Sequence, residues 1–146
     1  MNAWIVVLLL AAAFSPLVWI VPSRRQRGQM DVRLAARRMG LGMQMARPEW
    51  PHWMQPEPPA ACPQYHRQRL AGRGDWSFWQ VAPGEWHNRW REPCVDEPLL
   101  QLLRRLPADV YQVDANKQML ALYWGERGGE EELKTVVEVM QQLARL

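Results

Sequence analysis

Two cysteines and two histidines are the residues in this chain that could bind a metal ion together. Cys62 and His66 are four residues apart, whereas His87 and Cys94 are seven residues apart. Two thiolates and two imidazoles would complete the tetrahedral ligand set of zinc. Because the second spacing is wider than in zinc fingers, we predict no metal and no cofactor, and keep a zinc site at these four residues as an alternative.

Side chains for nucleophilic catalysis are scarce in the chain. Beyond residue 23 the only serine and threonine hydroxyls belong to Ser77 and Thr135, and neither lies in a G-x-S-x-G turn. The glycines at 40 and 42 lack the third glycine of a dinucleotide-binding loop. We therefore predict no catalytic residues and a protein that is not an enzyme, with a small metal-binding or enzymatic domain as the alternative.

Nine tryptophans are too many for the core of a small domain, because each ring buries roughly 150–250 Å². Tryptophan and arginine are typical anchors of protein interfaces. The surplus is concentrated around positions 50–53 and 76–90. We predict that a partner-binding surface is formed by Trp76, Trp79, Trp86, Trp90 and Arg89.

The alternation of arginine with tryptophan also suits single-stranded nucleic acid. Acidic residues lie in the same stretch, however, at Asp75, Glu85, Glu92, Asp96 and Glu97. They cancel the positive field that nucleic acid binding requires. A protein partner or a nearby bilayer surface is therefore favoured over nucleic acid.

Apolar spacing and turn residues predict the elements that must position these side chains. Strands are expected at 41–45, 64–70, 75–81, 110–113 and 118–124, and helices at 24–39, between Asp96 and Pro107, and at 130–143. Glycines at 72 and 74 predict that the second and third strands form a hairpin, and residues 114–117 predict another. This order indicates an α+β fold in which two helices cover a small antiparallel sheet.

The first residues carry the strongest pattern in the chain. Residues 3–22 hold no charge, and twenty residues of helix reach about 30 Å, the thickness of the hydrocarbon core of a bilayer. Trp4 and Trp19 lie near the two ends of this run, where aromatic rings favour the headgroup level. A cleavable signal peptide is less favoured because no basic residue precedes the run. We predict a transmembrane anchor over 1–23 that contacts the bilayer through 3–22.

The arginines that follow predict the orientation of this anchor. Arg24, Arg25 and Arg27 begin the cluster, and only Asp31 opposes it before residue 47. With Trp4 and Trp19, these three arginines form the expected membrane interface. The positive-inside rule then places the C-terminal domain in the cytoplasm, where Cys62 and Cys94 would be thiols. The opposite orientation would make them a plausible disulfide.

Between anchor and domain we expect two connecting segments. Residues 24–46 form a basic juxtamembrane helix and a short strand, and the helix is interpreted as a solvated stalk, with contact to anionic lipid as the alternative. Prolines recur through 47–63 and predict an extended linker. The α+β domain is then expected over 64–146.

These patterns together predict a class of protein but no particular task. Sixteen arginines and two lysines indicate a GC-rich, bacterial source. We therefore expect a single-pass protein of the bacterial inner membrane. Its cytoplasmic domain would bind a membrane or membrane-associated protein, as an adaptor, assembly factor or accessory subunit.

Overall fold

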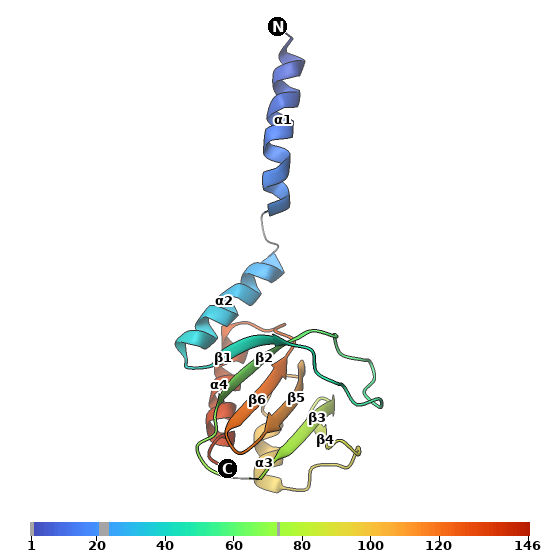
Figure 1. Cartoon of the computed structure of the whole chain (residues 1–146), viewed down its shortest axis with the longest axis vertical. Coiled ribbons are helices and arrows are strands. Elements are labelled where there is room, and N and C mark those ends of the chain that lie inside the picture. Colours follow the sequence, from blue (N-terminus) through green and yellow to red (C-terminus); the bar gives the residue numbers. More distant parts are fainter. Residues whose placement is uncertain (1, 21–23, 73) are drawn as a thin grey trace.

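A six-stranded antiparallel sheet forms the centre of the molecule (Figure 1). The computed structural model describes residues 2–20, 24–72 and 74–146, with the backbone alone for 14–20, 24 and 25. The strands lie in the order β1-β2-β6-β5-β3-β4. Their bounds are β1 (Gly42–Ala46), β2 (Cys62–Gln68), β3 (Trp76–Ala82), β4 (Glu85–His87), β5 (Val110–Ala115) and β6 (Met119–Trp124). The predicted α+β class is confirmed.

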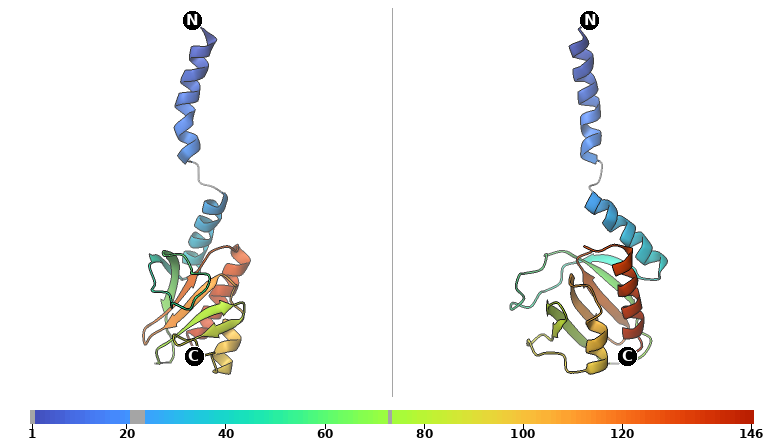
Figure 2. Two further views of the ribbon diagram at one scale, coloured as in Figure 1. Left: turned by 90° about the vertical axis from the view of Figure 1, so that its right-hand side faces the viewer. Right: turned by 180° about the vertical axis from the view of Figure 1, so that it is seen from behind.

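Four helices accompany the sheet in the described part of the chain: α1 (Ala3–Ile20), α2 (Arg24–Arg38), α3 (Glu97–Leu103) and α4 (Glu130–Leu143). Figure 2 shows α3 and α4 on one face of the sheet, and α2 packs against α4 and β1. The carboxylate of Asp96 accepts the N–H of Leu99 at the start of α3, and the Glu132 side chain accepts the N–H of Gly129 at the start of α4. Both helices therefore begin where local capping signals predict.

The core lies between the sheet and helices α2, α3 and α4. Along β6, Leu120, Leu122 and Trp124 belong to the core cluster, while Ala121 and Tyr123 alternate with them. This alternation follows from the two-residue period of a strand. The core also contains the full side chain of Trp86, which is 1% exposed.

The two predicted hairpins have different outcomes. β5 and β6 pair with each other, as predicted for the second hairpin. The first predicted hairpin is wrong, because β2 pairs with β1 and β6, whereas β3 pairs with β5 and β4. The β5–β6 hairpin separates β2 from β3 in the sheet, so residues 69–75 connect two strands that do not touch. β4 was not predicted; it is three residues long, too short for a periodicity to appear.

The proline-rich segment is not a free linker. Residues 47–61, called here the covering loop, contain no helix or strand, as the prolines predict. The loop nevertheless packs on the sheet, because the Trp50 ring lies edge-on to Tyr111 and Tyr123 at 5.7 and 6.1 Å. Met54 and Pro58 are buried. The loop thus covers part of the sheet face opposite the helices.

Helix α2 is part of the folded unit and not a solvated stalk. Val32 and Ala36 are 3% and 0% exposed and belong to the core cluster. β1, which follows α2, pairs with β2 over its whole length. The globular unit therefore includes residues that precede the expected boundary at residue 64.

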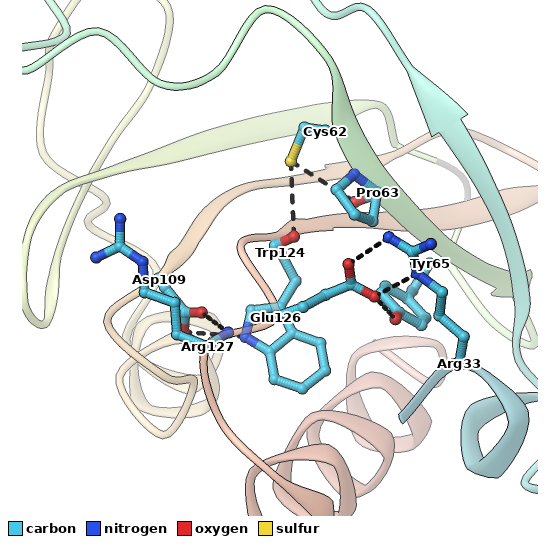
Figure 3. A network of polar contacts seen from close by, with 8 residues as sticks. All are labelled: Arg33, Cys62, Pro63, Tyr65, Asp109, Trp124, Glu126 and Arg127. Atoms are coloured by element: carbon cyan, nitrogen blue, oxygen red, sulfur yellow. Dashed lines mark hydrogen bonds and ion pairs between the residues drawn. The ribbon is translucent and has the colours of Figure 1, made fainter. Parts of the chain in front are cut away.

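A buried carboxylate attaches α2 to the rest of the fold (Figure 3). The Arg33 Nε and Nη2 atoms donate to Glu126 at 2.9 and 2.7 Å, and the Tyr65 hydroxyl donates to the same carboxylate. The Glu126 side chain is fully buried, whereas that of Arg33 is 34% exposed. The hydrogen bond to Glu126 raises the pKa of Arg33, and burial raises the pKa of Tyr65. At neutral pH, Arg33 is therefore charged and the phenol is a neutral donor.

The turn that carries Glu126 is also held from its other side (Figure 3). The carboxylate of Asp109 accepts the indole N–H of Trp124 at 2.9 Å and the backbone N–H of Arg127 at 2.8 Å. The N–H of Gly125 donates to the carbonyl of Asp109. These bonds fix the turn between β6 and α4, so Glu126 points to Arg33 with little freedom.

The transmembrane anchor is the least supported element. No helix is long and apolar enough to cross a membrane within the described part of the chain. The side chains of Trp19, Arg24 and Arg25 lie outside the described residues. The anchor and its orientation therefore stay predictions.

Replacing Arg33 by Met should lower the free energy of unfolding by about 2–4 kcal/mol, because Glu126 would keep a buried charge without its cation. Arg37→Met on the same helix removes an exposed arginine and should change it by less than about 0.5 kcal/mol. Urea unfolding of the full chain in mild detergent, followed by tryptophan fluorescence, measures both. Equal effects of the two substitutions would show that the ion pair does not hold α2.

Candidate partner-binding site

Half of strand β3 lacks a neighbour on one side. β3 pairs with β5 through residues 76–79 and with β4 through residues 79–82. Because β4 ends at His87, residues 76–78 have no strand partner on the β4 side within the described residues. Their outward backbone groups form an unpaired sheet edge among the described residues, and such an edge is a template for pairing with another chain.

A compact loop beyond β4 forms the opposite wall of this edge. The Asn88 side-chain oxygen accepts the N–H groups of Trp90 and Glu92, each at 3.0 Å. Two backbone bonds, from Asn88 to Glu92 and from Arg91 to Asn88, close the loop. The loop turns the Trp90 ring outward, where it is 75% exposed.

Together these segments form a hollow of about 470 Å³, called here the β3-edge groove. It is lined by Asp75, Trp76, Ser77, Phe78, Trp79, Asn88, Arg89 and Trp90. Four of the five residues predicted to bind a partner thus lie around one hollow. The fifth, Trp86, is 1% exposed and lies in the core, so its assignment to a binding surface is wrong. Trp79 is itself only 5% exposed and offers little surface to a partner.

The covering loop holds the groove in shape through Trp53. The indole N–H of Trp53 donates to the carbonyl of Arg89 at 2.9 Å. Its ring lies edge-on to Trp79 at 6.4 Å, and the Arg91 guanidinium lies 6.0 Å from its centre. The wall that carries Trp90 is therefore tied to the sheet before any partner arrives.

Four residues that line this groove were not predicted from the sequence: Asp75, Ser77, Phe78 and Asn88. Ser77 and Phe78 lie on the strand between the predicted tryptophans, and Asn88 folds the loop. Asparagine between two tryptophans is a turn signal that could have been used. Trp50 and Trp53 were counted with the exposed surplus, but both are half-buried and bond to carbonyls of the fold.

The structure does not bring the four metal-ligand candidates together. Cys62 and His66 lie on β2, whereas His87 ends β4 and Cys94 follows it. Four strand spacings of about 4.8 Å separate β2 from β4 in the sheet order, or about 19 Å. Within the described residues, no group of acidic, histidine or cysteine side chains could hold a metal ion.

Both cysteines are buried free thiols in the structure. Burial raises the pKa of Cys62 to about 12 and also raises the pKa of Cys94. The neutral thiol is therefore the dominant form of each at neutral pH. A neutral, inaccessible thiol is a poor nucleophile and a poor metal ligand.

A larger hollow of about 1030 Å³ lies between the covering loop and the β3–β4 turn. Its charged lining residues include Arg91 and Arg127 together with Glu57 and Asp109, so neither sign dominates. Asp109 already bonds Trp124 and Arg127. This hollow therefore indicates no particular ligand.

Neither a family model, nor a curated protein, nor a solved structure is similar enough to this chain to count as a match. The functional conclusion must therefore come from the site. In the β3-edge groove the Ser77 hydroxyl donates a hydrogen bond to the carboxylate of Asp114. The unpaired backbone edge of the groove and the exposed indole of Trp90 are suited to binding a polypeptide.

Alanine substitutions of Trp86 and Trp90 should lower the free energy of unfolding by very different amounts. Trp86→Ala empties a core position and should cost about 3–5 kcal/mol of unfolding free energy. Trp90→Ala removes an exposed ring and should cost less than about 0.5 kcal/mol. Thermal unfolding of the full chain in detergent compares them. Similar losses for the two variants would mean that Trp90 supports the fold and is not available to a partner.

Native cysteine reactivity tests the burial of both thiols. At pH 8, iodoacetamide should leave Cys62 and Cys94 unmodified for hours, because each is buried and its pKa is raised. Both should react within minutes in urea, and mass spectrometry counts the added groups. Modification of either native cysteine at the rate of the unfolded chain would contradict the described packing.

Proposed function

We propose that this chain is a membrane-tethered protein-binding module that captures an extended segment of its partner. The observation that carries the proposal is the unpaired edge of β3 beside the exposed Trp90. A bound segment would continue the sheet where β4 stops and place one side chain against the indole. Peptide recognition by strand addition uses backbone bonds for affinity and side-chain pockets for specificity.

The expected energetics are those of a modest interaction. A tryptophan anchor contributes about 2 kcal/mol or more, which is about a thirtyfold change in affinity. Asp75 and Arg89 lie in the same groove with opposite charges, so the groove has no strong preference for a charged segment. Because the loop is held by Trp53, little ordering is required upon binding, which favours affinity.

The N-terminal region supplies the tether in this proposal. The uncharged run over 3–22 suits a bilayer span, and the arginines after it suit the cytoplasmic side of a bacterial inner membrane. The partner would then be a membrane or membrane-associated protein. An adaptor, an assembly factor and an accessory subunit all fit this arrangement.

A random dodecapeptide library displayed on phage tests the groove even though its natural partner is unidentified. Peptides selected on the detergent-solubilised full chain should bind Trp90→Ala about thirtyfold more weakly. Leu70→Ala is the matched control, because Leu70 is 55% exposed outside the groove, and it should bind normally.

Hydrogen exchange locates the bound peptide. Amides at 76–78 should gain protection upon binding, because strand addition pairs this edge. Protection at β1 instead, or unchanged affinity of Trp90→Ala, would show that the β3-edge groove is not the binding site.

A further inference from the structure

Helix α2 exposes apolar side chains on the face that is turned away from the fold. Met30 and Leu34 are 55% and 53% exposed, and lie four residues apart, one above the other on the helix. Val32 and Ala36 take up the opposite face and are buried. The exposed pair is therefore not required for packing the described fold.

Arginines surround this exposed pair. At about 100° per residue, Arg27, Met30, Leu34, Arg37 and Arg38 fall within an arc of about 100°. The three arginines are exposed, and none of them has an ion pair among the described residues. Asp31 at the border of the arc is the one acidic residue of α2. The surface is thus strongly positive with an apolar centre.

We propose that this α2 surface, formed by Arg27, Met30, Leu34, Arg37 and Arg38, docks on the headgroups of an anionic bilayer. Arginine close to an anionic surface gains about 1 kcal/mol per side chain, and the two apolar side chains can enter the boundary between headgroups and acyl chains. The bilayer is the occupant that the chain itself favours, because apolar helix α1 ends only a few residues before α2. This inference rests on the membrane tether of the proposed function.

Docking of α2 would orient the whole folded unit. Arg33 and Glu126 join α2 to the turn after β6, so the helix cannot turn without the sheet. In Figure 1, α2 lies next to β1 at one end of the sheet, and β3 and β4 lie at the other end. Four strand spacings separate β1 from β3, or about 19 Å. The β3-edge groove would therefore lie at the end of the sheet that is farther from α2 and the lipid, where a partner can reach it.

An environment-sensitive fluorophore on Leu34→Cys tests the docking. The labelled full chain is reconstituted in vesicles of phosphatidylcholine alone or with 30% phosphatidylglycerol. Its emission should shift to the blue only with the anionic lipid, and 0.5 M salt should reverse the shift. The same label on Gln101→Cys, an exposed position of α3, should show no shift.

Charge removal supplies the matched comparison. Arg27→Gln, Arg37→Gln and Arg38→Gln together should lower the ratio of docked to free α2 by about a hundredfold. Arg104→Gln, Arg127→Gln and Arg145→Gln remove the same charge elsewhere and should leave it unchanged. Equal shifts in both lipids, no shift in either, or equal effects of the two triple variants would overturn the proposal.

Two further outcomes separate this inference from the tether. If the chain is lost from neutral vesicles but binds anionic ones in a salt-dependent manner, the tether is wrong and the α2 surface is supported. If a short RNA binds the chain at 0.15 M salt and the α2 triple variant abolishes that binding, the surface belongs to nucleic acid and the proposal is overturned.

Discussion

The carboxylate of Glu126 is the group on which the arrangement of this molecule depends. It is fully buried and takes two bonds from Arg33 and one from Tyr65. A buried carboxylate is costly unless it is paired and hydrogen-bonded. This requirement brings α2, β2 and the turn after β6 to one point, so α2 and the sheet behave as one body.

The second organising contact is the one between the covering loop and the sheet. Trp50 and Trp53 cover the face opposite the helices, and Trp53 also holds the loop that presents Trp90. A proline-rich segment is well suited to this task, because its backbone cannot join the sheet and few of its amides need partners. The segment that was predicted to be a linker therefore supports the wall of the groove.

The sequence predicts elements well where their signals are local. Apolar spacing and turn residues predict α3, α4, β5 and β6, and these are present. The β5–β6 hairpin was predicted, but pairings between distant strands could not be, because β2 meets β6 through residues more than fifty positions apart, as in Gln64 and Tyr123. The packing of α2 could not be predicted, because Arg33 has its partner, Glu126, 93 residues away in the sequence. Trp86 and Trp90 were indistinguishable by type and spacing, since only the β4 register decides which ring is buried.

The order of strands in the sheet has a consequence for how the chain reaches its structure during synthesis. The two central strands, β6 and β5, come from late in the sequence, while the flanking strands β1, β2, β3 and β4 are made first. Apart from the β1–β2 and β3–β4 pairs, no early strand can pair with its neighbour until the central β5–β6 hairpin has been translated. Arg33 likewise has no partner until Glu126 has been translated. A topology so dominated by distant contacts folds slowly. At a translation rate of about 5–20 residues per second, the early strands stay unpaired for several seconds. During that interval the unpaired strands of the nascent chain must be protected from aggregation.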